Sequence, residues 1–225
     1  MTGGPRLGAW PTLVAFACRT VLRLLVHVEV TGLERVPRSG PLIVAANHIS
    51  NADPPLVGGW LAPALSRRPR FLAKEQLFRG PVGWFLRSQG VIPVRAGGSD
   101  VDAYRQAKAI LDAGDVLVVF PEGTRSRDGR IGPPRPGVGL LATRLGVPIL
   151  PVGVSGSDRF LAPGSSRPRF RVPVIVRVGE PWQPAVPDGA DRRAGLTAVD
   201  AELMRRIAVL VEPRHRPPDG IAEGG

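Results

Sequence analysis

Hydrophobic and polar positions along the chain form short blocks that predict alternating strands and helices. Continuous apolar runs at residues 41–46 and 116–120 predict strands that are covered on both faces, because such strands lack a polar side. Further strands are expected at residues 26–30, near Phe71, and at residues 90–94, 147–154 and 170–178. Two prolines in the run 147–154 favour an edge or bulged strand there.

Apolar residues spaced three and four apart predict helices in the remaining blocks. A helix is expected to begin at Ser99, since Asp102 three residues later forms a capping box with it, and to end at Gly114. Further helices are expected at residues 138–145 and 196–211. This alternation favours one α/β domain over residues 27–212, and residues 213–225 are polar, rich in Pro and Gly, and expected to be a disordered tail.

Residues 1–26 are expected to hold an amphipathic helix that begins near Pro11. Its apolar positions recur at helical spacing at Leu13, Val14, Ala17, Val21, Leu24 and Leu25. Arg19 and Arg23 share another face, and the apolar stretch 9–18 is shorter than the roughly 20 residues that span a bilayer. Two interpretations stay open: the helix packs on the core, or it lies in a membrane interface with its arginines toward lipid phosphates.

The charge of the chain points to anionic partners. The formal net charge is +11, and 28 of the 30 basic residues are arginines, whose planar forks suit phosphates and carboxylates. Nucleic acid, a lipid headgroup or a phosphorylated small molecule would each fit. A single cysteine, Cys18, excludes an internal disulfide or a cysteine-cluster metal site. The three histidines are far apart in sequence, so no metal site is expected, and the cytosolic side is the default location.

The candidate chemistry lies in loops that follow the apolar strands, at residues 47–55, 95–98 and 121–136. In open α/β sheets, ligands bind at the carboxyl ends of strands. His48 follows a strand and Asp53 comes five residues later, which would place them about 140° apart in a continuous helix. If the chain leaves the strand as a loop, they can meet. The carboxylate would then fix the imidazole tautomer, and the free ring nitrogen could take a proton from a hydroxyl. Taken alone, this spacing is a weak signal, and a histidine that caps a strand end is the alternative interpretation.

A second group of residues could hold an anionic ligand. Glu122 could accept hydrogen bonds from substrate hydroxyls, and Gly123 allows close backbone approach. Arg125 and Arg95 could each direct a guanidinium at one phosphate. Individually, each of these residues is also compatible with an ordinary turn or a surface arginine.

Together these segments resemble a known family. Asn47-His48-x-Ser50-x-x-Asp53, Gly90-x-Ile92-x-x-Arg95, residues 120–126 (FPEGTRS) and residues 147–152 (VPILPV) occur in the order of the four sequence blocks of the lysophosphatidic acid acyltransferases, also called 1-acylglycerol-3-phosphate O-acyltransferases. The resemblance covers residues 28–154. It implies a glycerol-3-phosphate acyltransferase-like α/β fold with a mixed, mostly parallel sheet flanked by helices and a groove for an acyl chain.

The resemblance also implies roles for individual residues. His48 would be the general base and Asp53 the residue that orients it. The acceptor's phosphate and glycerol would be held by Arg95, Glu122, Gly123, Thr124 and Arg125, with Lys74 as a further basic position. The implied reaction moves an acyl chain from acyl-CoA or acyl carrier protein to the free hydroxyl of lysophosphatidic acid, giving phosphatidic acid. The acyl donor is a co-substrate, and neither a metal nor another cofactor is expected.

The chain is accordingly expected on the cytoplasmic face of the cell membrane, bound peripherally to an anionic surface. One rival is an acyltransferase with another lysolipid or glycolipid acceptor, and a second is a non-catalytic basic protein that binds nucleic acid or membrane. Nucleic acid is not the expected partner, because aromatic residues make up only 5% and the basic residues are scattered. A serine hydrolase is not expected either, because the chain has no Gly-x-Ser-x-Gly motif.

Overall fold

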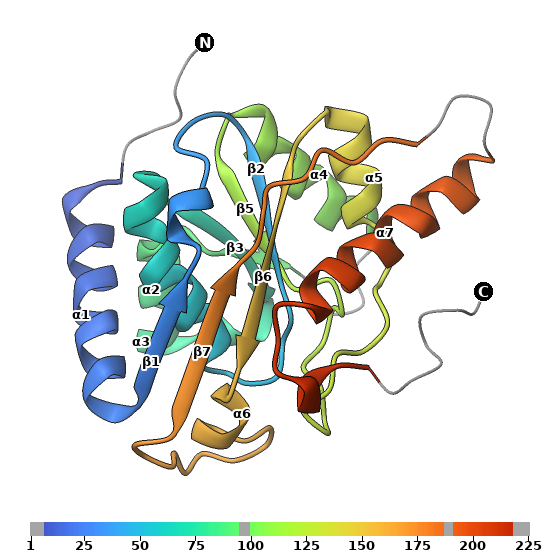
Figure 1. Cartoon of the computed structure of the whole chain (residues 1–225). Coiled ribbons are helices and arrows are strands. Elements are labelled where there is room, and N and C mark those ends of the chain that lie inside the picture. Colours follow the sequence, from blue (N-terminus) through green and yellow to red (C-terminus); the bar gives the residue numbers. More distant parts are fainter. Residues whose placement is uncertain (1–6, 95–99, 187–190, 218–225) are drawn as a thin grey trace.

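The computed structural model describes residues 7–94, 100–186 and 191–217, which form a central sheet with helices on both faces (Figure 1). The helices are α1 Ala9–Leu25, α2 Asp53–Leu65, α3 Gly80–Ser88, α4 Asp100–Asp112, α5 Val138–Leu145, α6 Ser157–Phe160 and α7 Arg192–Ala208. The strands are β1 His27–Thr31, β2 Leu42–Ala46, β3 Pro69–Lys74, β4 Ile92–Val94, β5 Val116–Val119, β6 Ile149–Ser155 and β7 Pro173–Val178. They follow the order β1-β7-β6-β2-β5-β3-β4, with only the β6–β7 pair antiparallel among these strands. The expected mixed, mostly parallel α/β sheet is confirmed.

The middle strands are apolar on both sides because two separate cores cover the sheet. In β2, Leu42, Val44 and Ala46 face the core beneath α1 and α2. Ile43 and Ala45 face the core beneath α4, α5 and α7. All five residues of β2 are fully buried, which explains the unbroken apolar run in the sequence.

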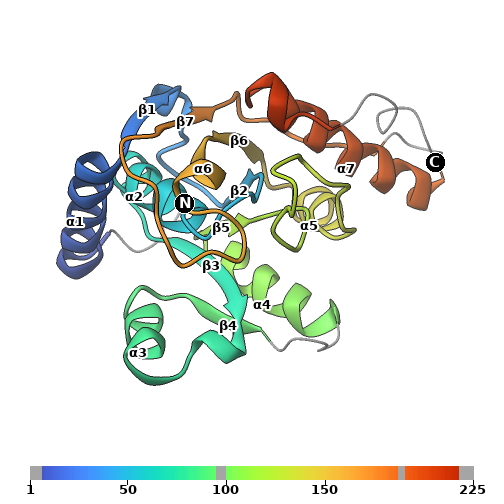
Figure 2. The same ribbon diagram turned by 90° about the horizontal axis from the view of Figure 1, so that it is seen from below.

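The carboxyl ends of β2, β3 and β5 lie at the same edge of the sheet, since these strands are parallel neighbours. Figure 2 shows the molecule from the side of this edge, where the loops after β2 and β5 leave the sheet. The loop after β2 spans residues 47–52 and the loop after β5 spans residues 120–137. The fold therefore brings two of the segments that carry candidate chemistry to one place.

Of the two alternatives for residues 147–154, an edge strand or a bulged strand, the edge strand is wrong, because β6 lies between β2 and β7. Its prolines are tolerated by their positions. Pro148 precedes the strand, and Pro151 lies opposite Ala45 of β2. The pairing of β6 with β7 covers only residues 152–155, so Pro151 lies outside that ladder. A missing N–H at this position removes no bond between β6 and β7.

Helix α1 exists where it was expected, but it buries a different side. Pro11, Ala15 and Leu22 are the buried residues, and the helix packs along α2. Much of the predicted apolar stripe faces outward instead, and Leu24 is 78% exposed. The small buried residues let α1 approach α2 closely, as the Gly59 backbone beside Ala15 and Cys18 shows. Residues of α1 are therefore part of the folded domain.

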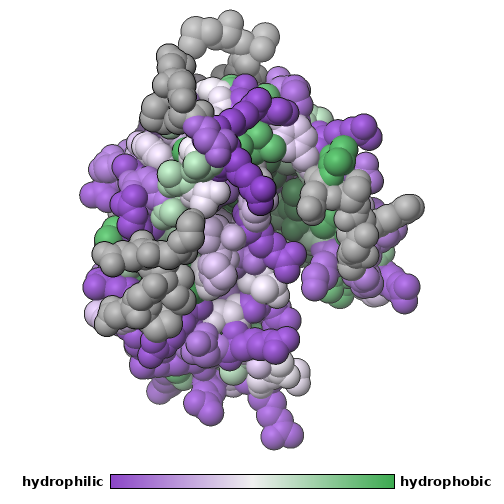
Figure 3. All heavy atoms as spheres, turned by 90° about the vertical axis from the view of Figure 1, so that its right-hand side faces the viewer, coloured by the Kyte–Doolittle hydropathy of each residue, from purple (hydrophilic) through white to green (hydrophobic). Residues whose placement is uncertain are grey.

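The outward side of α1 joins a second exposed apolar region at α3. The ring centroids of Trp10 and Trp84 lie 6.4 Å apart, and the indole N–H of Trp10 donates to Ser88 Oγ at 3.1 Å. The exposed large apolar residues of this surface are Trp10, Leu13, Phe16, Val21, Leu24, Leu77, Val82, Trp84 and Phe85. The side of the molecule that carries α7 contrasts with it, because it is mainly hydrophilic and shows hydrophobic residues only in small patches and within a hollow (Figure 3).

The predicted disorder from Pro213 is wrong for residues 213–217, which pack on the domain. Pro213–His215 form a 3-10 helix, and the His215 ring is buried. Its Nδ1 lies 2.5 Å from the Gly129 carbonyl oxygen, and the backbone N–H of Gly156 donates to its Nε2 at 3.3 Å. A buried imidazole with two such partners holds the segment, although its local composition is typical of a tail. The expected helix start at Ser99 lies outside the described residues, as does residue 95.

Candidate active site

The loop after β2 is tied to its surroundings by the polar side chains of its motif. The Asn47 amide pairs with Val154 of β6 twice: its Nδ2 donates to the carbonyl at 2.9 Å, and its Oδ1 accepts from the backbone N–H at 2.7 Å. Ser50 Oγ donates to the Leu161 carbonyl at 2.7 Å. Both side chains are buried, so these bonds hold the loop in one conformation.

The His48–Asp53 pair forms because the chain leaves β2 as a loop and becomes helical only at Asp53. His48 Nδ1 lies 2.8 Å from Asp53 Oδ2. The same oxygen accepts the backbone N–H groups of Ile49 and Ser50, each at 2.7 Å. A carboxylate is acceptor-only, so Nδ1 carries the proton, and Nε2 is the ring nitrogen left to accept one. Asp53 also stands in the first turn of α2, where the helix dipole favours negative charge.

Contacts from the loop after β5 hold the His48 ring and backbone in place. The ring stacks on Phe120, with the centroids 4.1 Å apart and 21° between the planes. The His48 N–H donates to Glu122 Oε1 at 2.9 Å, and its carbonyl accepts from the Ser126 N–H at 2.8 Å. The two loops are thus joined on both sides of this residue, which fixes the direction of its side chain.

Glu122 acts within the protein as a bridge between loops. Its second oxygen, Oε2, accepts the Gly132 N–H at 3.0 Å, so each carboxylate oxygen already has a backbone donor. Burial raises the pKa of the Glu122 carboxyl, and the two N–H donors oppose that shift only in part. The geometry accordingly gives Glu122 a role in joining the loops. Its expected contact with substrate hydroxyls stays a prediction.

The turn at residues 123–125 presents side chains to two cavities. Gly123 has φ +66°, and a Cβ there would lie 2.4 Å from Arg135 Cδ, so the Arg135 stem crosses this turn closely. Thr124 and Arg125 line both cavities. Arg125 is half-buried, and its buried Nη1 has no hydrogen-bond partner among the described residues. A buried guanidinium nitrogen without a partner is suited to receive an anionic oxygen.

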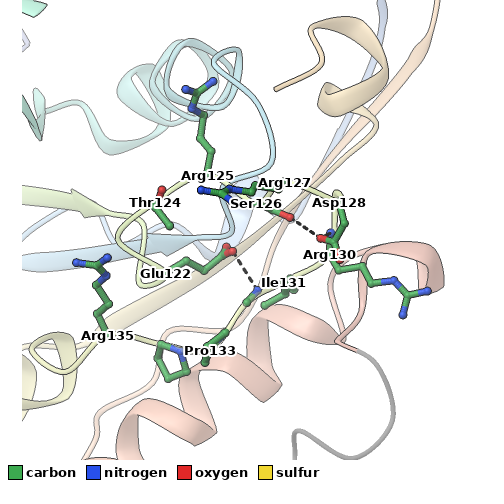
Figure 4. A pocket seen from close by; sticks show the side chains of 12 residues that line it. Glu122, Thr124, Arg125, Ser126, Arg127, Asp128, Arg130, Ile131, Pro133 and Arg135 are labelled. Atoms are coloured by element: carbon green, nitrogen blue, oxygen red, sulfur yellow. Dashed lines mark hydrogen bonds between the residues drawn. The ribbon is translucent and has the colours of Figure 1, made fainter. Parts of the chain in front are cut away.

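The smaller of the two cavities, about 460 Å³, lies within the loop after β5. Arginines are frequent in its wall: Arg125, Arg127, Arg130 and Arg135. Figure 4 shows Thr124 and Arg135 on one side of this cavity and Arg130 on the opposite side, where its side chain extends outward. Glu122 lies between the two sides and accepts the Gly132 N–H. The local surplus of positive charge suits a ligand with a phosphate.

The larger cavity, about 760 Å³, runs from His48 and the 123–125 turn into the space between helices α1, α2 and α3 and strand β3. Its lining is mainly apolar, including Val14, Ala15, Phe71 and Leu86. Cys18 also lines it, and burial raises the pKa of that thiol, which disfavours the nucleophilic thiolate. One space therefore joins the imidazole, an arginine and an apolar region.

The structure thus brings five of the expected site residues around His48, namely Asp53, Glu122, Gly123, Thr124 and Arg125. Lys74 is exposed at the end of β3 and lines the larger cavity. Arg95 lies outside the described residues. Sequence reasoning missed the Phe120 stacking and the closeness of Arg135. It also missed Ser157, which donates to Asp53, because an isolated serine 104 residues away carries no signal.

Within the ranges that the structure describes, no group of three or more His, Cys, Asp or Glu side chains is arranged to hold a metal ion. The same ranges contain no helix whose length and apolar character would let it cross a bilayer.

Comparisons with known proteins point in one direction. The family model described as Acyltransferase matches residues 27–155, more than half of the chain. The chain is 33% identical over 141 residues to the chloroplastic 1-acyl-sn-glycerol-3-phosphate acyltransferase BAT2 of Brassica napus, covering 61% of this chain and 40% of the relative. It is 32% identical over 139 residues to the 1-acyl-sn-glycerol-3-phosphate acyltransferase of Borreliella burgdorferi, covering 60% and 54%.

A solved structure is similar as well. The crystal structure of the 1-acyl-sn-glycerophosphate (LPA) acyltransferase PlsC from Thermotoga maritima matches with a TM-score of 0.70 and 28% identity, covering 89% of this chain and 79% of that one. The matched region spans about two-fifths to half of the two curated relatives' own lengths. Both the His48–Asp53 pair and the 123–125 turn lie inside the segment that the family model matches.

Proposed function

Because the chain belongs to the acyltransferase family, we propose that it transfers an acyl chain from a thioester donor to the free hydroxyl of 1-acyl-glycerol-3-phosphate, giving phosphatidic acid. One observation carries this proposal. The imidazole bonded to Asp53 lines the same cavity as the 123–125 turn and the apolar space between α1, α2 and α3. A base, an anion-binding arginine and a place for a hydrocarbon chain are the three things that this reaction needs.

In the proposed reaction, His48 Nε2 takes the proton of the acceptor hydroxyl as its oxygen attacks the thioester carbonyl. The tetrahedral oxyanion collapses, the carbon–sulfur bond breaks, and the leaving thiolate takes the proton from His48 Nε2, which returns the imidazole to its neutral form. Asp53 keeps Nδ1 protonated and stabilises the imidazolium that forms. General-base help of this kind contributes roughly 10²–10⁴-fold to the rate. The reaction uses the side chains of the protein and the two substrates, with no further cofactor.

Arg125 would hold the acceptor phosphate, and Thr124 and Lys74 line the same cavity. Arg95 would supply the second guanidinium. The buried Nη1 of Arg125, which has no hydrogen-bond partner among the residues that the structure describes, supports this role. Holding the phosphate places the neighbouring hydroxyl near His48, and such orientation is worth several kcal/mol of the barrier, of the order of a tenfold rate gain for each 1.4 kcal/mol. The mainly apolar cavity would take an acyl chain, and the donor is acyl-CoA or acyl carrier protein.

The proposed function is tested by thiol release from a long-chain acyl-CoA with lysophosphatidic acid as acceptor. We expect His48→Ala to lose nearly all turnover, by roughly 10³-fold or more, because both the base and its alignment are removed. His27→Ala is the matched control, since His27 is exposed on β1 and distant in the sheet order from β2. Retained turnover in His48→Ala would remove His48 as the base. A preference for monoacylglycerol or another lysolipid would replace the proposed acceptor.

We further propose that the protein binds peripherally to the anionic cytoplasmic face of a membrane through the exposed apolar surface of α1 and α3. Phe16 and Leu24 are 65% and 78% exposed, and Trp10 and Trp84 join the two helices. Exposed clusters of large apolar and aromatic side chains are typical of interfacial binding. The larger cavity is lined by the same two helices, so an acyl chain could pass from lipid to His48 without crossing water.

This location is tested with the double variant Phe16→Glu, Leu24→Glu in a flotation assay on vesicles that contain anionic lipid. We expect the wild type to float with the vesicles and the double variant to stay in the soluble fraction, because two charges would enter the interface. Val209→Glu is the control, since Val209 is 71% exposed after the end of α7, on the other side of the sheet. Equal flotation of all three proteins would contradict the proposed surface.

A further inference from the structure

A buried serine outside the matched family segment contacts the proposed catalytic pair. Ser157 is the first residue of α6 and is fully buried. Its Oγ donates to Asp53 Oδ1 at 2.5 Å, across 104 residues of sequence. The hydroxyl bonds to the carboxylate and not to the imidazole, so it is not placed as a nucleophile in the manner of a serine hydrolase.

The two oxygens of Asp53 have unequal sets of partners. Oδ2 accepts from His48 Nδ1 and from two backbone N–H groups. Oδ1 accepts only from Ser157 among the hydrogen bonds of the described residues. Rotation about the last bond of an aspartate side chain has weak intrinsic preferences, so the partners decide the plane of the carboxylate. Ser157 is the group that sets this plane from the Oδ1 side.

The serine itself is held rigidly. Gly156, just before it, has φ +83°, and a Cβ there would lie 2.1 Å from the Pro173 carbonyl oxygen, so a larger residue would displace this turn. Two residues earlier still, Val154 is paired in both directions with the Asn47 amide. Strand β6 therefore both positions Ser157 beside Asp53 and binds Asn47 of the loop after β2.

We propose that Ser157 is a positioning residue of the acyl transfer: its hydroxyl orients the Asp53 carboxylate so that Oδ2 stays on His48 Nδ1. The inference rests on the proposed function for its kinetic effect, but the orientation itself exists without substrate. Removal of the hydroxyl leaves Oδ1 buried without a donor, so the carboxylate would turn or draw in water, and the imidazole would lose its fixed direction.

The test combines kinetics with the signal of one proton. We expect Ser157→Ala to lower kcat about tenfold while KM for both substrates is unchanged, because a misaligned base affects the chemical step. Ser157→Thr keeps the hydroxyl and should restore most of kcat. Ser155→Ala is the matched control: Ser155 is also buried, but its Oγ accepts the Glu212 N–H, and Ser155 is not among the hydrogen-bond partners found for Asp53. It should keep the wild-type kcat.

The second readout is the NMR resonance of the His48 Nδ1 proton, assigned by its absence in His48→Ala. We expect the resonance to be broadened or lost in Ser157→Ala and kept in Ser155→Ala. An unchanged resonance, or a kcat within twofold of wild type, overturns the role of Ser157. If the resonance depends on Ser157 but wild-type protein releases no thiol, the positioning stands and the proposed function fails, so the two failures are distinguishable.

Discussion

The loops after β2 and β5 meet at His48 but are built in opposite ways. The loop after β2, residues 47–52, is short: four of its six residues are buried, and the buried Asn47 and Ser50 side chains are hydrogen-bonded within the protein. The loop after β5, residues 120–137, is longer and rich in arginine, and eight of its 18 residues are exposed. The first presents one imidazole in one direction, and the second presents several cations around an open space. The difference separates the two tasks of the proposed enzyme: fixed chemistry on one loop and recognition of an anionic acceptor on the other.

If this separation is real, a change in the first loop should affect turnover most. We expect Asp53→Asn to lower kcat by roughly 10³–10⁴-fold, because a neutral amide no longer stabilises the imidazolium. Asp200→Asn is the control, since Asp200 is also a buried aspartate but accepts the Gly139 N–H at 2.8 Å between α5 and α7. Steady-state kinetics on both variants decide the matter. A loss of kcat in Asp200→Asn as large as in Asp53→Asn would show general damage instead.

A change in the second loop should affect binding instead of turnover. We expect Arg125→Ala to raise KM for lysophosphatidic acid roughly 10- to 100-fold, the range for losing a charged hydrogen bond, with a smaller effect on kcat. Arg144→Ala removes the same charge from an exposed position on α5 and should change neither constant. With monoacylglycerol as acceptor, Arg125→Ala and wild type should have the same KM, because this acceptor has no phosphate for Arg125 to bind. A loss of kcat in Arg125→Ala as large as in Asp53→Asn would contradict the proposed division between a catalytic loop and a binding loop.

Glu122 joins the two loops, and its effect should be the smallest and should depend on pH. A carboxyl whose folded-state pKa is raised binds more protons in the folded state than in the unfolded state. Stability is therefore greatest below the ordinary carboxyl pKa and declines as pH rises through the raised pKa of Glu122. Glu122→Gln has no such titration, and it leaves one of the two backbone N–H groups without an acceptor, a cost of about 1–3 kcal/mol.

The destabilisation by Glu122→Gln should accordingly be larger at pH 5 than at pH 8, where the wild type bears the full penalty of a buried charge. Urea unfolding of both proteins at the two pH values measures this difference. A destabilisation that grows with pH would contradict the assigned direction of the pKa shift and would place the carboxylate in a more solvated position than the structure shows.

Much of the local structure could be predicted from the sequence, because it depends on neighbours along the chain. The apolar runs at β2 and β5 predict doubly covered strands, and each is found within a residue or two of its expected bounds. The short helix α5 begins and ends where its pattern indicates. Even the contact of His48 with Asp53 is local, since it requires only that a loop separate the strand from the helix.

Other features depend on residues that are distant in sequence. The spacing of apolar residues in α1 predicts a helix, but apolar side chains lie on more than one of its faces. Only the presence of α2 therefore decides that Ala15 faces inward and Leu24 outward. Likewise, residues 213–217 look like a tail until the buried His215 meets Gly129 and Gly156. The interior position of β6 follows from pairing with β2 and β7, which no pattern within β6 reveals.

By itself, the sequence determined the strands β1 to β7, the helices α1, α4, α5 and α7, and the motif residues that could carry acyl transfer, because these depend on short-range spacing. The helices α2, α3 and α6 were not indicated by the sequence pattern. Only the tertiary structure decided that Glu122 bridges two loops, that the cavity reaches α1 and α3, and that Ser157 completes the bonding of Asp53. These contacts arise when sheet pairing brings distant segments together, and the sequence around a single serine or glutamate does not indicate which distant residue it will contact.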